Sequence, residues 1–525
     1  MRILLVTYWS YPHIGGVSTH LNIVRSRLEE MGHEVDVLAQ HPNLTKYYFV
    51  QSGVSIHKQS YLKTAESAVK LIFKRGGIEP TPWILWRETE KYAFELVCNE
   101  IPLEDYDLIH AQDIISSYVC RKAKPPHVPL VTSIHSCQAT EWIANNEIQV
   151  RSRLERDYLS LEEYFGSMSP DCLIVPSRWL SANLSYFHVN HPSESIIPYG
   201  LNQKAYRDLL KESETKASLD EAVQKNIDKR KTVIACPARF VVIKGQTYLL
   251  QAMRKLADVT ENVVCWLIGD GVMRRELEQQ VNNLGLGNHV FLLGNRDDVP
   301  QLLSQADIVV FPSLQDNLPY SIIEAQSLGK PVVASRTGGI VEMIEEGING
   351  LLAEPRNVQE LYEKLLLLIQ DEELRAELSR EARKRALAVW NDMVMLEQML
   401  HVYEKAVTKG SEPVLWEQDF IAALKYCSKN YKGIKEGGII HVTSLLGKVL
   451  DTASSRPVSN ANIHLLDISG VVLRSISSDA VGRFRFHDVQ PGNYELGWSV
   501  PMSSGLRTRK IVVSTLEPLD IEVTV

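Results

Sequence analysis

The chain lacks a cysteine framework and any apolar run long enough to cross a membrane. Its 525 residues include seven cysteines, none in a C-x-x-C pair, which argues against a disulfide-stapled domain and a cysteine-rich zinc site. No apolar run approaches the roughly 20 residues of a membrane-spanning helix. The first residues also become polar too early for a signal peptide. We therefore expect a cytoplasmic protein with reduced, mostly buried thiols.

An excess of positive charge and a dinucleotide-binding fingerprint are missing as well. The net charge is −8, which argues against a dominant nucleic-acid-binding surface. The turn after the first expected strand carries Gly15-Gly16 and no G-x-G-x-x-G, so the pattern typical of NAD-binding proteins is absent. Two adjacent glycines at a helix start still let a diphosphate approach the backbone. A simple tight turn is the commoner explanation.

Short apolar runs alternate with helical patterns over the first 400 residues, which is typical of an α/β protein with parallel sheets. Residues 203–230 are charged and lack strong apolar periodicity, so we interpret them as the connection between two Rossmann-like lobes. Helices are expected at 358–388 and 390–406. Strands are expected at residues 2–7, 34–39, 107–113, 130–136, 172–177, 195–201, 232–240, 263–268, 289–295, 307–311, 331–335 and 347–352.

The stretch from 307 to 339 combines a buried strand, a polar loop, a helical run at 320–328 and a second strand. The loop lies at the carboxyl end of a strand and the amino end of a helix, where free N–H groups favour an anion. Asp316 and Glu324 are eight residues apart and could hold two ends of one polar ligand. A solvated loop, with Asp316 as the helix N-cap, is the alternative on spacing alone.

Two cations follow the strand that opens the second half of the chain. Arg239 comes at its end, and Lys244 precedes a helical pattern at 246–256. Fixed cations at such a place suit a diphosphate, because they neutralise charge that develops as it leaves. Ordinary surface cations are the alternative.

Two histidines, His110 and His135, lie at the ends of expected strands in the first half. Ligands of open parallel sheets bind beyond the carboxyl ends of strands, although a lone histidine there is usually structural. Asp105-Tyr106-Asp107 opens a strand and does not end one, so we do not interpret it as a metal site.

Taken together, these motifs resemble the retaining glycosyltransferases of family 4 (glycosyl transferases group 1). The resemblance covers about residues 1–406 and is most specific from Arg239 to Gly339. It implies an α/β protein of the GT-B fold, with two Rossmann-like lobes facing a cleft. It also implies transfer of a sugar from a nucleotide sugar, a UDP-sugar, to a glycan or small-molecule acceptor in glycan, polysaccharide or glycoconjugate biosynthesis. No metal and no cofactor are implied, because the nucleotide sugar is a substrate and two cations serve its phosphates.

The resemblance also assigns roles to single residues. Glu324 matches the acid that binds the ribose hydroxyls, and Asp316 stands where a longer Glu beside the donor sugar is usual. His135 resembles the histidine next to the reacting sugar, while Arg239 and Lys244 would neutralise the diphosphate. These five form the expected catalytic set. The expected donor-binding set is Gly15, Gly16, Gly269, Asn295, Arg296, Asn317, Leu318, Tyr320 and Ser321.

From about residue 439 the sequence changes to short strand patterns separated by turn residues, which predicts an all-β sandwich. Residues 482–486 and 490–494 resemble the prealbumin-like modules of the carboxypeptidase regulatory-like or Cna-B-like type, which implies contact with a protein or glycan. The expected strands are 442–449, 461–466, 471–477, 482–486, 492–500, 507–513 and 519–525.

The expected domain organisation has five parts. They are an acceptor-side lobe (1–205), a nucleotide-sugar lobe (206–389), a helix that crosses back to the first lobe (390–410), a linker (411–436) and the β-sandwich module (437–525).

Two other functions stay open at this point. One is a non-catalytic glycan-binding or scaffold protein that acts through its C-terminal module. The other is a GT-B phosphorylase carrying pyridoxal phosphate, for which the sequence has no motif. The basic, apolar segment 62–75 could touch the inner face of a membrane, although we favour a solvated helix face.

Overall fold

The computed structural model describes residues 1–13, 15–144, 147–203, 206, 231–409 and 420–425, and most of the strands between 443 and 524. The chain divides into two compact units, Met1–Lys429 and Asn430–Val525. The expected connection at 203–230 lies almost wholly outside the described residues, as does most of the expected linker.

The first lobe is built on an eight-stranded sheet of order β4-β3-β2-β1-β5-β6-β7-β8. From β2 to β8 the pairing is parallel, and β3 and β4 add an antiparallel edge that the sequence pattern does not predict. The strands are β1 (Arg2–Ser10), β2 (Glu34–Gln40), β3 (Lys46–Phe49), β4 (Ser55–His57), β5 (Leu108–Ala111), β6 (Leu130–Ser133), β7 (Cys172–Val175) and β8 (Glu194–Ile196).

The central strand β1 shows why both faces of this sheet are covered by helices. Leu4 and Val6 enter one buried apolar cluster, while Ile3 and Leu5 enter another. Successive side chains of a strand point to opposite faces, so a strand that is apolar throughout requires a helical layer on each side. The helices are α1 (Gly16–Glu30), α2 (Gln59–Gly76), α3 (Pro82–Asn99), η1 (Leu103–Asp105), α4 (Ile114–Ala123), α5 (Gln138–Ala144), η2 (Glu147–Val150), α6 (Arg153–Met168) and α7 (Arg178–Ser185).

The second lobe has a six-stranded, fully parallel sheet of order β11-β10-β9-β12-β13-β14. Its strands are β9 (Thr232–Pro237), β10 (Val263–Ile268), β11 (Val290–Gly294), β12 (Ile308–Phe311), β13 (Val332–Ser335) and β14 (Gly350–Ala353). Its helices are η3 (Val242–Lys244), α10 (Gln246–Val259), α11 (Arg274–Asn283), α12 (Val299–Gln305), α13 (Tyr320–Ser327), α14 (Ile340–Met343), α15 (Val358–Gln370) and α16 (Glu372–Val389).

The strand order of this second sheet reverses between β9 and β12. The chain builds β9, β10 and β11 outwards in one direction and then continues with β12 on the other side of β9. The connections that leave β9 and β12 therefore start side by side, at the kind of position where open parallel sheets bind ligands.

One predicted helix is two helices in the structure. The sequence pattern predicts a continuous helix over 358–388, whereas α15 ends at Gln370 and α16 begins at Glu372. Asp371 separates them, and its Oδ1 accepts a hydrogen bond from the backbone N–H of Leu374 at 2.9 Å. An aspartate that caps a new helix takes a non-helical backbone conformation, which ends the preceding one.

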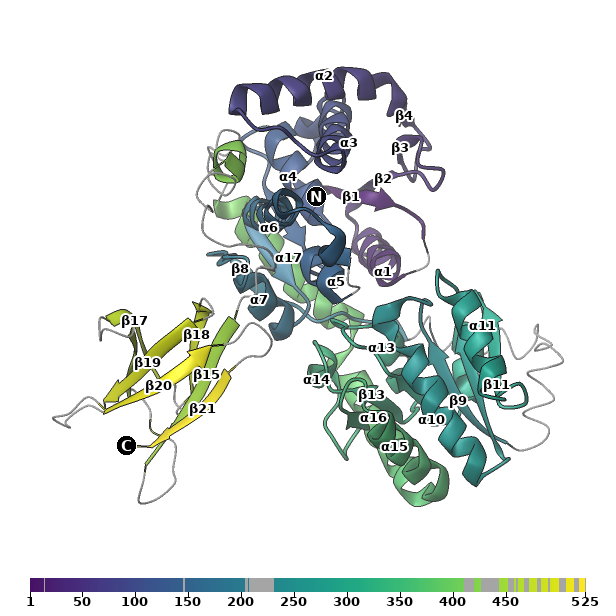
Figure 1. Ribbon diagram of the computed structural model, residues 1–525. Helices are drawn as coiled ribbons and strands as arrows, with labels where there is room; N and C mark the ends of the chain where they lie inside the picture. The colour runs from purple at the N-terminus through teal and green to yellow at the C-terminus, as the bar shows by residue number, and fades with distance from the viewer. Residues whose placement is uncertain are drawn as a thin grey trace. The chain divides into compact units, whose positions relative to one another are not determined.

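The helix α17 (Asp392–Lys409) follows the second lobe in the chain but packs into the first. Figure 1 shows it, in green, among the blue elements of the first lobe. Its Met395 and Tyr403 belong to the same buried cluster as Ile3. Asp392 accepts a hydrogen bond from Arg27 Nε of α1 at 2.6 Å. The first lobe is therefore completed by residues near position 400.

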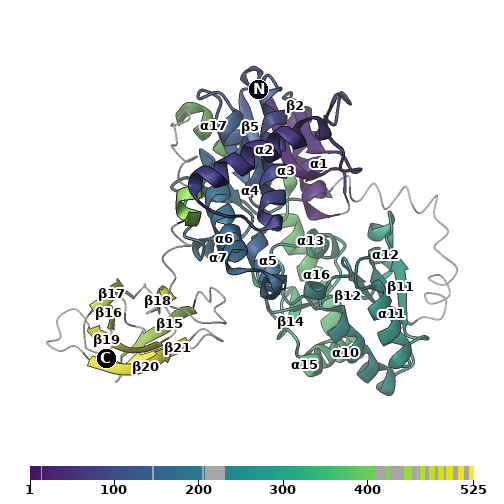
Figure 2. The same cartoon turned by 45° about the horizontal axis from the view of Figure 1, so that its top comes forward.

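The long helix α2 lies along α3 at the outer side of the first lobe, as both views show (Figures 1 and 2). Ala65, Val69 and Phe73 are buried against the lobe, while Leu71 and Ile72 are exposed. Among the described residues, no helix is long and apolar enough to cross a membrane. All six described cysteines are free, and all are buried, as the sequence predicts for most of them.

The C-terminal unit consists of two small sheets, which confirms the predicted β-sandwich. A three-stranded sheet has the order β18-β15-β21, and a four-stranded antiparallel sheet has the order β17-β16-β19-β20. The strands are β15 (Thr443–Leu450), β16 (Asn462–Leu466), β17 (Val472–Ser477), β18 (Arg483–Val489), β19 (Gly492–Ser499), β20 (Arg507–Val513) and β21 (Leu519–Thr524).

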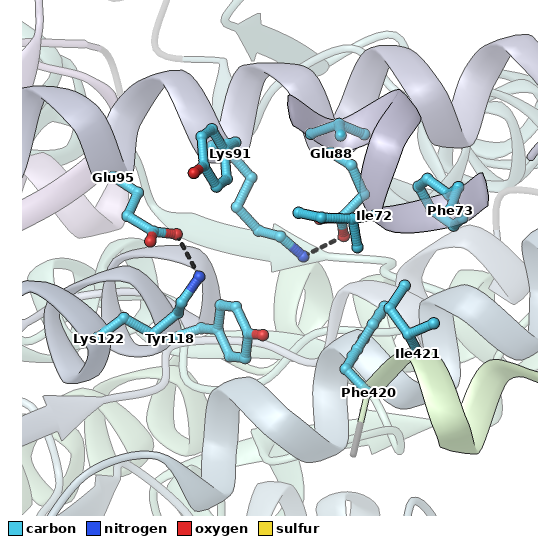
Figure 3. Close-up of a pocket in the computed structure, with 11 residues that line it drawn as sticks. Ile72, Phe73, Glu88, Lys91, Glu95, Tyr118, Lys122, Phe420 and Ile421 are labelled. Atoms are coloured by element: carbon cyan, nitrogen blue, oxygen red, sulfur yellow. Dashed lines mark hydrogen bonds and ion pairs between the residues drawn. The ribbon is translucent and has the colours of Figure 1, made fainter. Parts of the chain in front are cut away.

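A short helical segment, residues 420–425, covers a cavity of about 50 Å³ in the first lobe (Figure 3). Phe420 lies 4.9 Å from the ammonium of Lys91, and Lys91 pairs with Glu88. A second pair, Lys122 with Glu95, lines the same cavity at 2.6 Å. Because the cations are matched by carboxylates and an aromatic face, we interpret the cavity as part of the packing of this segment.

We expect Phe420→Ala to destabilise the first unit by about 3–5 kcal/mol, because a buried aromatic ring is lost and a cavity remains. The ring packs among Tyr118, Tyr158 and Phe165 with centroid distances of 5.3–6.3 Å. Denaturant unfolding followed by tryptophan fluorescence would measure the change. Ala422→Ser, at an exposed position of the same segment, should change stability by less than about 0.5 kcal/mol.

Candidate active site

The connections that leave β9 and β12 bring Lys244 and Asp316 together. Lys244 Nζ donates to Asp316 Oδ2 at 2.5 Å, and both side chains are about 15% exposed. The Ser313 hydroxyl approaches the same carboxylate oxygen at 3.4 Å. Arg239 belongs to the same connection as Lys244, and its carbonyl accepts a hydrogen bond from Gln246 Nε2 at 2.9 Å. An ammonium group has three donors, so Lys244 keeps capacity for an anion.

Glycines allow the connections after β9 and after β13 to pack, backbone against backbone, on the connection after β12 that carries Asp316. Gly245 adopts a positive φ of 69°, and a Cβ there would lie 1.9 Å from the carbonyl oxygen of Pro312. Gly338 has a φ of 58°, and a Cβ there would lie 1.7 Å from the carbonyl oxygen of Asp316. A side chain at either position would therefore displace the backbone that carries Asp316.

The amino end of α13 is not capped by Asp316, which was the alternative interpretation of this loop. Pro319, and not Asp316, occupies the N-cap position, and no side chain caps the helix. The first N–H groups of an α-helix have no intrahelical acceptor. The backbone N–H groups of Tyr320 and Ser321 are therefore available to a ligand, whereas Pro319 has none.

Two residues of the expected donor-binding set have side chains engaged elsewhere. Leu318 is buried in the apolar core of the second lobe. The hydroxyl of Tyr320 lies 3.2 Å from Nδ1 of His20, which belongs to α1 in the first lobe. Tyr320 also touches Gly16, where a Cβ would lie 3.4 Å from its ring. Only the backbone of these two residues can serve the donor as expected.

Polar contacts link the loop before α13 to the first lobe. Asn317 Nδ2 donates to the carbonyl oxygen of His135 at 2.8 Å, and Ser177 donates to Asn317 Oδ1. Gln315 Nε2 donates to the Thr140 hydroxyl at 3.2 Å. The loop that carries Asp316 is thus held by groups of the opposite lobe.

His135 lies at the centre of this contact between the lobes. Its Nε2 is 3.1 Å from Gln112 Oε1 and its Nδ1 is 2.7 Å from the Tyr199 hydroxyl. The amide oxygen can only accept, so Nε2 carries the proton and Nδ1 accepts from Tyr199. Burial lowers the pKa of His135 to about 4, which keeps the imidazole neutral near pH 7. The Tyr199 ring stacks on Tyr320 at 4.8 Å.

Glu324 lies one turn further into α13 than Tyr320 and is half-buried. Burial raises the pKa of its carboxyl group to about 7. Nearby is the hydroxyl of Tyr206, which is buried and has no hydrogen-bond partner among the described residues. Hydrogen-bond donors, such as two adjacent hydroxyl groups of a ligand, would stabilise the ionised form of a carboxyl group that is partly removed from water.

Three further expected residues lie in the connections that follow β10 and β11. Gly269 donates from its N–H to the carbonyl of Gly294 at 2.9 Å, and a Cβ there would lie 2.3 Å from the carbonyl oxygen of Ala238. Asn295 is exposed. Arg296 is held by Asp298 through two hydrogen bonds of 2.7 Å.

The turn at Gly15-Gly16 reaches the cationic connection from the first lobe. His13 lies beside it, with its backbone N–H 3.0 Å from the Ser18 hydroxyl. Burial lowers the pKa of His13, and the charge of Arg239 contributes to this shift. Arg239 is therefore near the glycine turn. His110, by contrast, is fully buried, and its ring nitrogens lie 2.7 Å from the Tyr403 hydroxyl and 2.8 Å from the Ser133 hydroxyl.

Sequence reasoning missed two residues of this region. His20 is one turn after Gly16 and contacts the rings of His135 and Tyr199. Glu141 lies on α5, six residues after His135, and interacts electrostatically with Lys244, Arg239 and Asp316. Neither has a distinctive spacing. Their only signal is their closeness in the chain to Gly16 and His135. The described residues contain no group of three His, Cys, Asp or Glu side chains placed to hold a metal ion.

Comparison with known families gives the class of the protein. The model of glycosyl transferases group 1 matches residues 218–385, and that of glycosyltransferase family 4 matches residues 14–203. A carboxypeptidase regulatory-like domain matches residues 444–525. Sucrose-phosphate synthase of Thermosynechococcus elongatus has a similar structure, with a TM-score of 0.60 at 20% identity over 78% of this chain and all of that one. The two lobes thus form a glycosyltransferase of the GT-B fold.

Relatives in sequence agree with this class. The MMP alpha-(1->4)-mannosyltransferase of Mycolicibacterium hassiacum is 25% identical over 78% of this chain and 99% of its own. An N-acetylgalactosaminyltransferase of Campylobacter jejuni, which acts on a diphospho-undecaprenol, is 32% identical over 40% of this chain and 53% of its own. The chain belongs to the family 4 glycosyltransferases (group 1) and carries a carboxypeptidase regulatory-like module after the catalytic region.

Proposed function

We propose that this glycosyltransferase moves a sugar from a UDP-sugar to an acceptor hydroxyl with retention of the anomeric configuration, in the synthesis of a glycan, polysaccharide or glycoconjugate. The observation that carries the proposal is the Lys244–Asp316 pair at the strand-order reversal, beside the free start of α13. A sugar diphosphate offers the anion that the cation and the helix start attract, and hydroxyl groups for the carboxylate.

Two findings support the donor class. A relative in Escherichia coli, 21% identical over 67% of this chain, is named as an alpha-1,3-galactosyltransferase that uses UDP-Gal. Anabaena HepE, with a TM-score of 0.54 at 20% identity over 77% of this chain, has been solved with UDP-glucose. The α-linkage in the first name agrees with retention, because the sugar of UDP-Gal is itself α-linked.

The residues would share the reaction as follows. The bond between the anomeric carbon and the diphosphate oxygen breaks while the acceptor oxygen bonds to the same face, and the acceptor proton passes to the departing phosphate oxygen. Arg239 and Lys244 neutralise the charge that this step places on the diphosphate. Glu324 holds the ribose hydroxyls, while Asp316 and neutral His135 orient the transferred sugar.

A ligand panel tests the proposal on the full chain. UDP and UDP-sugars should raise the apparent stability of the protein, by about 2.7 kcal/mol at a concentration of 100 Kd, and the transferable one should release UDP. No stabilisation by any nucleotide sugar, with stabilisation by a free glycan, would support the scaffold function. An absorbance of a lysine-bound cofactor would support the phosphorylase.

We also propose that the transfer needs no metal ion. Two cationic side chains would serve the diphosphate, which is the task that Mg²⁺ performs where such side chains are missing. Adding EDTA to the UDP-release assay should therefore leave the rate within about twofold. Loss of activity with EDTA, and its return on adding Mg²⁺, would show that Arg239 and Lys244 do not suffice.

A further inference from the structure

The carboxyl group of Glu141, in the first lobe, lies close enough to the proposed donor site to interact electrostatically with all three of its charged residues. Lys244 and Arg239 attract its negative charge, Asp316 repels it, and the Ser136 side chain forms a hydrogen bond with it. Its neighbour Thr140 is bonded to Gln315 of the opposite lobe at 3.2 Å. Glu141 is half-buried, so it is neither a solvated surface charge nor a core residue.

A hydrogen bond to α6 helps to hold α5, the helix that carries Glu141. The carboxylate of Glu163 is 1% exposed and accepts a hydrogen bond from the backbone N–H of Ala139 at 3.0 Å, at the start of α5. Together with the Thr140 contact, this ties the first turn of the short helix α5 both to α6 and to the loop before α13. A carboxylate on a helix held in this way can orient a ligand, because little ordering remains to be done when the ligand binds.

The negative charge of Glu141 determines which part of a sugar diphosphate it can bind. Two negative groups at contact distance repel each other, so Glu141 cannot bind the phosphates that Arg239 and Lys244 attract. The hydroxyl groups of the attached sugar are the donors next to that place. Asp316, the other carboxylate, is already bonded to Lys244, Ser313 and its neighbouring N–H of Asn317. Glu141 has no such cationic partner in direct contact among the described residues.

We propose that Glu141, from the first lobe, binds a hydroxyl group of the transferred sugar in addition to Asp316 from the second lobe, and so contributes to the choice of donor sugar. This rests on the proposed UDP-sugar donor. Burial raises the pKa of Glu141, and hydrogen bonding and the nearby cations oppose that rise. A sugar hydroxyl would add a further donor for the ionised form.

A comparison of the affinity for UDP with the affinity for a UDP-sugar isolates the contact between Glu141 and the sugar. Calorimetry on the full chain gives the Kd of UDP and of UDP-glucose, UDP-galactose and UDP-N-acetylglucosamine, for the wild type and for Glu141→Gln. We expect the ratio Kd(UDP-sugar)/Kd(UDP) of the tightest sugar to rise about tenfold, as for a lost hydrogen bond to a charged group. UDP itself should bind as well as before or somewhat more tightly, because a negative charge near the cations is removed.

The matched control is Glu147→Gln, the same change at an exposed position six residues further along, which should leave the ratio unchanged. An unchanged ratio in Glu141→Gln would overturn the inference, including the case in which only the use of an acceptor is impaired. Retained UDP binding shows that the variant is folded. Failure of the wild type to bind UDP or any UDP-sugar would instead overturn the proposed function.

Discussion

Replacing Lys244 by alanine should lower kcat of sugar transfer by roughly 10²–10³-fold, the usual loss when one preorganised group opposite developing charge is removed. The charge in question appears on the diphosphate oxygen as the bond to the sugar breaks. Lys244 is placed for this because it is held by Asp316 at 2.5 Å in a partly buried site, where electrostatic interactions are stronger than in water. Steady-state release of UDP from the donor, with and without acceptor, measures the effect.

The control for this experiment is Lys255→Ala on α10, which removes an exposed lysine from the next helix and should leave kcat within twofold. Circular dichroism should show both variants folded. Asp316 keeps its contacts with Ser313 and the N–H of Asn317 in Lys244→Ala. Near-normal turnover of a folded Lys244→Ala variant would show that the diphosphate leaves elsewhere.

Glu324→Ala should weaken UDP binding about 100-fold, because the ribose hydroxyls would lose a charged acceptor and hydrogen bonds to charged groups are worth about 1.5–3 kcal/mol each. Calorimetric titration with UDP measures the loss. Glu345→Ala, at an exposed position of the same lobe, should bind UDP normally. A UDP affinity unchanged by Glu324→Ala would remove this residue from the donor site.

The pH dependence of UDP binding gives an independent test of Glu324. Burial raises the pKa of this carboxyl group to about 7, and only the ionised form accepts from both ribose hydroxyls. UDP affinity should therefore rise between pH 6 and pH 8, and this rise should be absent in Glu324→Gln. A raised pKa also means that the folded protein binds the proton more tightly than the unfolded chain. The stability that the Glu324 carboxyl group contributes to the ligand-free protein is therefore fully present below about pH 4.5 and is lost as the pH rises towards 7.

This chain departs from the family pattern by having an aspartate, Asp316, at the position that lies beside the donor sugar in the family, and the pairing with Lys244 shows where its shorter side chain points. A glutamate, one methylene longer than Asp316, is usual at this position. In the structure the shorter side chain is turned to Lys244 and Ser313. The carboxylate of Glu141 faces the same charges from the other lobe. We infer that two acids, one from each lobe, share the sugar contacts here.

Most of the fold was predictable from local patterns. The central strands of both sheets, such as β1, β5, β9 and β10, are buried along nearly their whole length, so their apolar runs stood out against the polar turns. The β-sandwich followed from short alternating strands with turn residues between them. The edge strands β3 and β4 and the break at Asp371 were not foreseen, because a short edge strand and a capping residue inside a helical pattern leave weak periodic signals.

The sequence by itself determined the order of the elements, the class of the protein and the identity of Arg239, Lys244, Asp316 and Glu324 as the residues of interest. The order of the elements follows from periodicity along the chain, whereas the class and the choice of these four residues rest on the resemblance of their motifs to the family 4 glycosyltransferases. Tertiary structure alone decided that Lys244 and Asp316 meet, since their pairing depends on β9 and β12 being neighbours in the sheet. It also decided that His20, His135 and Glu141 face the second lobe. Such contacts, between residues 72 positions apart for Lys244 and Asp316 and 182 apart for His135 and Asn317, arise from packing, for which no local pattern in the sequence exists.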